Sequence, residues 1–371
     1  MAKVSESAII NIGKVLNDPT RPMKERFRAL FTLRNLGGEK SIECISECFK
    51  DESVLLKHEL AYCLGQMQDK RAIPVLRKVL EDTNQDPIVR HEAGEALGAI
   101  GDPNLRELLE KYQNDTAIEV AETCQIALQR LNWIASDRAD EGTNLSKSPY
   151  TSIDPAPPSC ETDVEMLKKT LLDENKPLFE RYRAMFSLRN LSSSDSINAL
   201  GEGLKASSAL FRHEVAFVFG QMQDERSIPY LKKTLEDACE HEMVRHEAAE
   251  ALGSIATDEC TEVLKRYLND PRRVVRESCE VALDMSEYEN SPEFQYANTL
   301  ITMSDLLETE RTTFFGLTHE VLLSVSTLEI VEQLHTAVWQ HAQGDRKVRR
   351  YFESYETPFV GQGRRKMSRN V

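Results

Sequence analysis

The sequence contains one internal duplication, at a constant offset of 155 residues. The segment ERFRALFTLRNL at residues 25–36 returns as ERYRAMFSLRNL at residues 180–191, with nine of twelve positions identical. The same offset relates VRHEAGEALGAI at residues 89–100 to VRHEAAEALGSI at residues 244–255. Because self-similarity of this kind marks repeat architectures, we expect a fold built from two copies of one larger unit.

Each copy has a finer period of about 32 residues. We place Arg26, His58, His91 and, approximately, Ala121 at equivalent positions of four successive units. Every unit contains two amphipathic stretches, such as RAIPVLRKVLED, in which apolar residues recur at helical spacing. Paired helices of this length that stack on their neighbours form an α-solenoid. We therefore predict an all-α solenoid of eight short helical-hairpin repeats, in two pseudo-symmetric four-repeat halves that face each other.

Glycine and proline mark the expected helix boundaries. Four glycines near the ends of the second helices are expected to act as C-terminal stops, namely Gly65, Gly98, Gly220 and Gly253. Pro74 and Pro229 are expected in first turns, where the missing N–H is harmless.

A polar segment separates the two copies. Residues 136–163 are rich in Ser, Pro, Thr and Asp and lack a helical period, which is typical of a flexible linker. We therefore divide the chain into an N-terminal half (1–135), this linker, and a C-terminal half (164–290). Two half-solenoids that fold back on each other need such a linker, whereas a continuous solenoid does not. Residues 291–371 match neither half and are expected to form a non-repeat C-terminal extension.

Charge and cysteine content limit the partners and the compartment. The last 30 residues hold eight Lys/Arg and three Asp/Glu, so the others hold 38 Lys/Arg against 58 Asp/Glu, a net charge of −20. Such a body repels nucleic acid and attracts cationic ligands. Neither a signal peptide nor an apolar run of roughly 18 residues is visible, so no membrane association is expected. Eight cysteines without a Cys-x-x-Cys pair favour a cytoplasmic chain with reduced thiols.

Four His-Glu dipeptides occupy equivalent positions in the repeats. They are His58-Glu59, His91-Glu92, His213-Glu214 and His246-Glu247, and the two pairs within each half are 33 residues apart. Equivalent helices of adjacent repeats run roughly 8–10 Å apart, so histidines at the same helical phase can reach one metal ion between them. Because imidazole and carboxylate groups are preferred ligands of divalent first-row metals, we predict a metal site in each half.

The spacing leaves the roles of the glutamates open. Successive helical side chains diverge by about 100°, so one glutamate can face a metal while another binds a substrate ammonium group. Surface or packing roles are expected for the remaining histidines and their neighbours, namely His241-Glu242, His319-Glu320, His335 and His341. Two other functions fit the residues: a non-catalytic scaffold that binds a basic partner, and a dinuclear metallohydrolase.

This arrangement of four His-Glu pairs in two four-repeat halves, joined by a polar linker, resembles the deoxyhypusine hydroxylase family over roughly residues 5–290. The resemblance implies HEAT-like repeats and a di-iron monooxygenase. It implies that the enzyme hydroxylates the deoxyhypusine side chain of translation initiation factor 5A to hypusine. Two Fe(II) ions per chain, O2 as co-substrate and an external electron donor, which the sequence does not identify, are implied with it.

The resemblance also assigns roles to the paired residues. One iron would be bound by His58, His91 and Glu92, and the other by His213, His246 and Glu247. Glu59 and Glu214 would line the substrate channel and face the ammonium groups of deoxyhypusine. No catalytic residue is implied beyond the metal centre.

Overall fold

The computed structural model of this protein describes residues 4–136, 148–291 and 296. All regular secondary structure in these residues is helical, which confirms the expected all-α class. Residues 149–151 are grouped with the C-terminal residues in a second unit, of which nothing else is described. The predicted extension lies outside the described residues, apart from its first residue and Tyr296, and so do His319-Glu320, His335 and His341.

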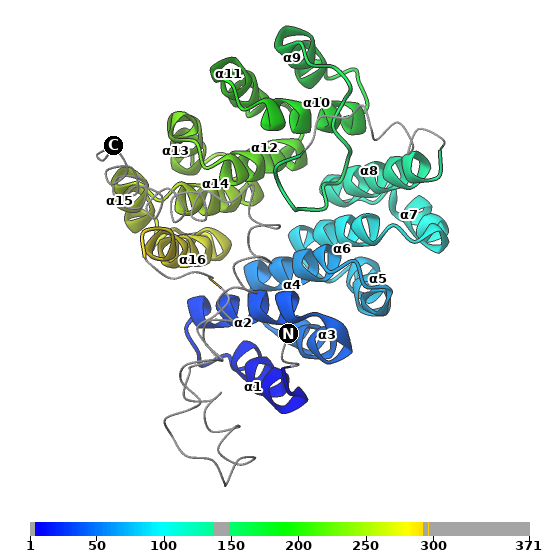
Figure 1. Ribbon diagram of the computed structural model, residues 1–371, viewed down its shortest axis with the longest axis vertical. Coiled ribbons are helices and arrows are strands. Elements are labelled where there is room, and N and C mark those ends of the chain that lie inside the picture. Colours follow the sequence, from blue (N-terminus) through cyan, green and yellow to red (C-terminus); the bar gives the residue numbers. More distant parts are fainter. Residues whose placement is uncertain (1–3, 137–147, 292–295, 297–371) are drawn as a thin grey trace, which may run out of the picture. The chain divides into compact units, whose positions relative to one another are not determined.

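Sixteen α-helices occur in the described residues, and they pair as successive helical hairpins (Figure 1). The first half contains α1 (Glu6–Leu16) with α2 (Met23–Leu36), α3 (Gly38–Glu47) with α4 (Val54–Gln66), α5 (Ile73–Glu81) with α6 (Pro87–Ile100), and α7 (Arg106–Tyr112) with α8 (Ile118–Ile134). The second half contains α9 (Val164–Leu172) with α10 (Leu178–Leu191), α11 (Ser194–Gly203) with α12 (Ala209–Met222), α13 (Ile228–Glu236) with α14 (Glu242–Ile255), and α15 (Asp258–Arg266) with α16 (Arg273–Glu289).

The even-numbered helices form a closed inner ring. Each of them contacts the next along the chain, from α2 to α16. The two halves meet twice, because α8 packs against α10 and α16 packs against α2. In Figure 1 the odd-numbered helices lie around the outside of this ring. Helices from both halves therefore surround one common centre.

Local sequence signals set the beginnings of these helices. The hydroxyl groups of Ser53 and Ser208 cap α4 and α12, as serine commonly does at this position. Pro74 and Pro229 lie in the first turns of α5 and α13, as expected. Within the described part of the chain, no helix is long and apolar enough to cross a membrane. All eight cysteines lie in this part and are free thiols.

The glycines near the ends of the inner helices serve close packing, so their expected role as helix stops is wrong. A Cβ atom at Gly253 in α14 would lie 2.5 Å from the carbonyl oxygen of Ala282 in α16. At Gly65 in α4 it would lie 2.6 Å from the Cα atom of Ala96 in α6. Each of these glycines is inside its helix, and α14 ends instead at Ile255, followed by the C-cap Ala256, whose φ is 61°. Adjacent inner helices touch here, and only glycine leaves room.

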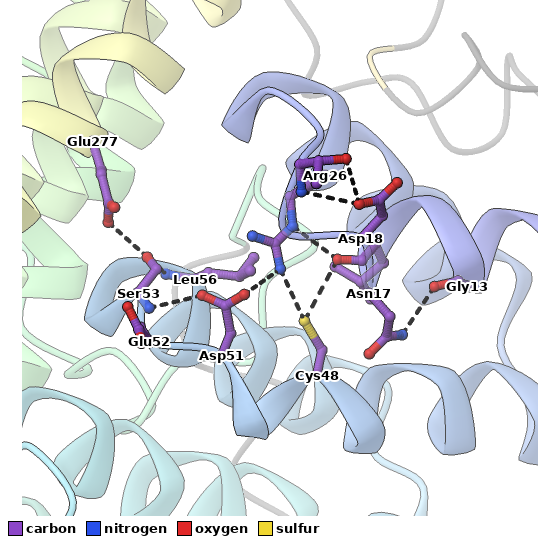
Figure 2. A network of polar contacts seen from close by, with 12 residues as sticks. Gly13, Asn17, Asp18, Arg26, Cys48, Asp51, Glu52, Ser53, Leu56 and Glu277 are labelled. Atoms are coloured by element: carbon purple, nitrogen blue, oxygen red, sulfur yellow. Dashed lines mark hydrogen bonds and ion pairs between the residues drawn. The ribbon is translucent and has the colours of Figure 1, made fainter.

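A buried arginine recurs in the inner helices. Its Nε donates a hydrogen bond to a carbonyl ten residues earlier in four repeats, at Arg26, Arg90, Arg181 and Arg245. Three of these arginines also pair with an aspartate 25 residues later, at Asp51, Asp115 and Asp270. Figure 2 shows this contact between Arg26 and Asp51. Arg26 is therefore equivalent to Arg90, which shifts by one residue the register expected from sequence.

The described part of the segment expected as a linker packs against the repeats. Ala156 is fully buried, and Asp154 forms an ion pair with the fully buried Arg189 of α10. Polar composition alone does not predict such an anchored course.

Candidate metal centre and substrate cavity

The fifth residue of every inner helix occupies the same place in its repeat. Around the first half this position holds Phe27, His58, His91 and Glu122, and around the second half Tyr182, His213, His246 and Glu277. The histidines therefore occupy the two middle repeats of each half, as the grid predicted, while aromatic and acidic residues occupy the outer repeats.

The four histidines form a single buried cluster. The ring centroids of His58 and His91 are 5.4 Å apart, and so are those of His213 and His246. Between the halves, the His58 ring lies 5.7 Å from His213 and 5.2 Å from His246. None of the four is more than 4% exposed. The distance between the halves, which sequence could not give, is thus short enough to join two predicted sites into one centre.

Most imidazole nitrogens in this cluster have no hydrogen-bond partner in the part of the chain that the structure describes. This holds for both nitrogens of His58, His91 and His213, and for Nε2 of His246. Buried polar atoms are usually hydrogen-bonded, and each one left unpaired costs about 1–3 kcal/mol. Nitrogen lone pairs that no hydrogen bond occupies are available to a metal ion. The residues present therefore fit a metal centre.

Two carboxylates complete the cluster symmetrically. A carboxylate oxygen of Glu92 lies 3.3 Å from His58 Nε2, and one of Glu247 lies 3.4 Å from His213 Nε2. Neither contact has hydrogen-bond geometry at the histidine nitrogen. Nitrogen and oxygen donors of this kind suit divalent first-row metal ions.

The possible ligand atoms group across the halves as well as within them. His213, His246 and Glu247 offer atoms within 4.8 Å of one another, in agreement with the expected set of one half. The same distance limit also groups His58 and His91 with His213 of the other half. His58 is close both to Glu92 and to His91, and the histidines of the two halves are not separated into independent sites.

Two further acidic residues, Glu95 and Glu250, belong to the cluster and were not expected from the grid. Glu250 Oε1 lies 3.4 Å from His246 Nδ1 and accepts a 3.0 Å hydrogen bond from Ser278. Glu95 lies within 4.8 Å of possible ligand atoms of His91 and Glu92. The sequence signal is the longer pattern His-Glu-Ala-x-Glu, which occurs only in the third repeat of each half.

Burial shapes the charge of the cluster. It lowers the pKa of His91 and His246 well below the ordinary value, helped by repulsion from neighbouring histidines. Neutral imidazole is the form that binds metal ions. Burial also raises the pKa of Glu95 and Glu250 well above the ordinary value, with a further contribution from neighbouring carboxylates. A cation at this place would relieve the repulsion among the carboxylates.

A cavity of about 360 Å³ adjoins the cluster. Acidic and aromatic side chains dominate its wall, and they are Glu59, Glu92, Glu95, Glu214, Glu247, Glu250, Glu289, Phe27, Phe31, Tyr62, Phe217, Tyr288 and Tyr296. Glu59 and Glu214, expected in a substrate channel, both line it, and Oε1 of Glu214 is buried without a hydrogen-bond partner among the described residues. The cavity suits a cation carried on an aliphatic chain.

The off-grid histidine of the repeats has a different position. His241 is the N-cap of α14, where its Nδ1 accepts a 3.2 Å hydrogen bond from the backbone of Met243. Its side chain is 41% exposed and lies near Glu119. His241 therefore has a structural role away from the cluster.

The fold and the site define a helical-repeat protein with a buried centre of histidine and carboxylate side chains. The family model of HEAT repeats matches residues 43–129 and 197–284. Deoxyhypusine hydroxylase of Drosophila melanogaster is 60% identical over 298 residues, which cover 80% of this chain and 97% of the relative. The human enzyme is 58% identical over 297 residues, covering 80% and 97%.

A solved structure agrees with this likeness. The structure of human deoxyhypusine hydroxylase in complex with glycerol has a TM-score of 0.73 and 58% sequence identity, and the match covers 76% of this chain and 97% of that one. The chain belongs to the deoxyhypusine hydroxylase family, which confirms the resemblance drawn from the His-Glu pattern.

Proposed function

We propose that this enzyme is a di-iron, O2-dependent monooxygenase that converts the deoxyhypusine side chain of translation initiation factor 5A to hypusine in the cytoplasm. The observation that carries this proposal is the cluster of four buried histidines whose nitrogens lack hydrogen-bond partners among the described residues. The names of the relatives support the reaction.

Six residues would hold the two Fe(II) ions. They are His58, His91 and Glu92 for one ion, and His213, His246 and Glu247 for the other. When bound, the iron ions would supply O2 activation: with two electrons from an external donor and two protons, one oxygen atom would enter an unreactive C–H bond and the other would leave as water. The protein contributes the donor atoms, a sheltered cavity and the position of the substrate.

Glu59 and Glu214 would bind the ammonium groups of the substrate. Burial raises the pKa of Glu214 well above its ordinary value, and the nearby Glu95 carboxylate raises it further. Burial raises the pKa of Glu59 as well. An ammonium group between such carboxylates would favour their charged forms and gain charge-assisted hydrogen bonds. A dicationic side chain therefore complements this wall better than a neutral one.

The aromatic part of the wall would hold the aliphatic part of the substrate. Phe27, Phe31 and Phe217 face the cavity next to the carboxylates, and the rings of Tyr62 and Phe217 are 6.0 Å apart. Apolar rings exclude water around the methylene groups and fix their position relative to the centre. This division of the wall would orient one C–H bond toward the metal ions.

The test is incorporation of oxygen-18. The iron-loaded enzyme is given the deoxyhypusine form of the factor, an electron donor and ¹⁸O2, and the modified peptide is analysed by mass spectrometry. We expect one labelled oxygen atom in the side chain, and loss of the product with His91→Ala. His241→Asn, which keeps a capping side chain, serves as the control with normal activity. Turnover without O2, or with zinc alone, would contradict the proposal and favour hydrolytic chemistry.

A further inference from the structure

The duplication relates two junctions of the inner ring. The wall of the cavity where α2 meets α16 includes Phe31, Val281 and Met285. The offset of 155 residues places their counterparts where α10 meets α8, at Phe186, Ile126 and Arg130. In the described part of the chain Phe31 and Met285 are partly exposed, so the cavity reaches the surface there. By symmetry alone, a second mouth of the cavity should open beside α8 and α10.

This second mouth is closed. The space beside Ile126 and Arg130, which is lined by α6 and α8, measures only about 10 Å³, and Pro155 forms part of its wall. Phe186 is fully buried, whereas its counterpart Phe31 is only partly buried. Pro155 belongs to the segment between the halves, so this segment occupies the space beside Ile126 and Arg130, whereas the equivalent residues Val281 and Met285 line the cavity.

The filling segment, Ser152–Pro158, is held by its carboxylate. Asp154 accepts hydrogen bonds of 2.9 Å and 2.6 Å from the guanidinium group of Arg189 in α10. This arginine is fully buried and lies over the ring of Phe186. Breaking a buried ion pair of this kind costs about 3–5 kcal/mol, because one charge then lacks a partner.

Further hydrogen bonds from three other inner helices add to this anchor. The carbonyl of Asp154 accepts a 2.8 Å hydrogen bond from Arg130 in α8. Ile153 exchanges two hydrogen bonds with the amide of Gln66 in α4. Gln221 in α12 donates a 2.9 Å hydrogen bond to the Ser152 hydroxyl. A tether between two halves needs none of these contacts, so the segment has a fixed place in the wall.

We propose that residues 152–158 form a plug that closes one of two pseudo-equivalent mouths, so that, within the part of the chain that the structure describes, the substrate side chain enters between α2 and α16. The identity of what enters rests on the proposed function, whereas the closure does not. The duplicated site could otherwise bind the substrate in two opposite orientations, and a single entrance allows only one of them. Glu59 and Glu214 then meet different ends of the substrate, and a single C–H bond reaches the metal centre.

Thiol reactivity tests the closure without metal or substrate. The two exposed cysteines, Cys160 and Cys239, are first changed to serine. Ile126→Cys then reports on the closed mouth and Met285→Cys on the open one, with a small charged methanethiosulfonate as the reagent. Adding Asp154→Ala removes the anchor of the plug. We expect Ile126→Cys to react about tenfold or more faster in this background, while the rate at Met285→Cys is unchanged.

Either of two results would overturn the plug. One is rapid labelling of Ile126→Cys with the anchor intact, and the other is an unchanged rate after Asp154→Ala. If Asp154→Ala unfolds the protein, so that Met285→Cys and the six buried native cysteines also react, the variant Pro155→Gly with Pro157→Gly replaces it. This second variant keeps the ion pair and loosens only the plug, and the same two results then decide.

Substrate protection tests the direction of entry. With the plug intact, the iron-loaded enzyme and a saturating amount of the deoxyhypusine-form factor should slow labelling of Met285→Cys. The proposed substrate and entrance would be contradicted if the factor did not slow labelling of Met285→Cys. The closure would still stand if Ile126→Cys reacted slowly with the plug intact and faster after Asp154→Ala. The two failures are therefore distinguishable.

Discussion

Ser53 and Glu277 lie 224 residues apart and share a 2.6 Å hydrogen bond that joins the first turn of α4 to α16 (Figure 2). The duplication repeats this contact, because Ser208 donates a 2.6 Å hydrogen bond to Glu122. Both glutamates are the fifth residues of their helices, the position that carries histidine in the middle repeats. The fifth position of the inner helices thus carries the histidines of the buried centre in the middle repeats of each half. In the last repeat it carries the glutamate that joins one half to the other.

Removal of this acceptor should weaken the closure of the ring. Glu277→Ala leaves the Ser53 hydroxyl without its partner across the junction, so we expect the free energy of unfolding to fall by about 1–2 kcal/mol. Urea denaturation followed by circular dichroism measures the loss. The exposed neighbour Glu280 is the matched control, with a change within about 0.5 kcal/mol on substitution by alanine. Equal values for both variants would show that the junction does not depend on this bond.

The packing glycines should not tolerate a methyl group. Gly253→Ala brings a Cβ atom within 2.5 Å of the backbone of α16, so α14 and α16 must separate. We expect a loss of about 1–3 kcal/mol in the free energy of unfolding. Gly94→Ala is the control in another inner helix, since its nearest neighbour is a side-chain methyl group of Thr123 at 3.3 Å and not the backbone of the next helix. The prediction fails if thermal melts show the two variants to be equally stable.

Glu250 should orient His246 for metal binding. Its carboxylate lies 3.4 Å from Nδ1 of this histidine and is itself held by Ser278. Such partners commonly change metal affinity by about 10–100-fold when removed. We expect Glu250→Ala to lower iron affinity by this factor in competition with a chelator, and Glu250→Gln to restore part of it. An unchanged affinity in Glu250→Ala would leave this residue with a role in the cavity wall only.

The Arg90–Asp115 pair predicts a dependence of stability on pH. Its hydrogen bond with Arg90 holds the pKa of Asp115 below the ordinary value. Between the folded pKa and the unfolded value of about 3.9, the unfolded chain binds more protons, so stability rises with pH. The contribution is present above about pH 4 and is lost as the pH falls through the folded pKa. Asp115→Asn should remove this part of the pH profile, measured as urea midpoints between about pH 3 and 7.

The contribution of such a pair to the free energy of unfolding at neutral pH can be measured at two equivalent arginines, Arg90 and Arg181. Asp115→Asn leaves Arg90 buried without an ionic partner, so we expect a loss of about 3–5 kcal/mol at pH 7. Ala206 stands where the pattern would place the aspartate of Arg181, whose Nη2 is buried without a hydrogen-bond partner in the described residues. Ala206→Asp should therefore stabilise the protein, by about 1–3 kcal/mol, and Ala206→Asn by less. A destabilising Ala206→Asp would show that this site cannot take the carboxylate.

Local spacing accounts for what could be predicted from the sequence. Helix content follows from the helical spacing of apolar residues, and the repeats and the four-histidine grid follow from periods of 33 and 155 residues. All of these are visible without any tertiary information. The repeat register was harder, because the outer repeats replace histidine with aromatic or acidic residues. In the structure Phe27 is the counterpart of His91, because each is the fifth residue of its helix. The sequence pattern pointed instead to the neighbouring Arg26.

Long-range contacts account for what could not be predicted. Glu95 and Glu250 carry a short sequence signal, but their closeness to the histidines depends on which face of α6 and α14 is turned inward. The pairing of Asp154 with Arg189 has no local signal, because a polar, proline-rich segment has the same composition whether it is mobile or packed. Ring closure between α16 and α2 likewise depends on the whole solenoid.

The metal content of the purified protein tests the central claim most directly. Elemental analysis by mass spectrometry on protein isolated under mild conditions should give about two iron atoms per chain, the number that the six nitrogen and oxygen ligand residues suit. His91→Ala should lower this value, and His241→Asn should leave it unchanged. Stoichiometric zinc or manganese in place of iron, or a metal content that is the same in His91→Ala, would contradict the account.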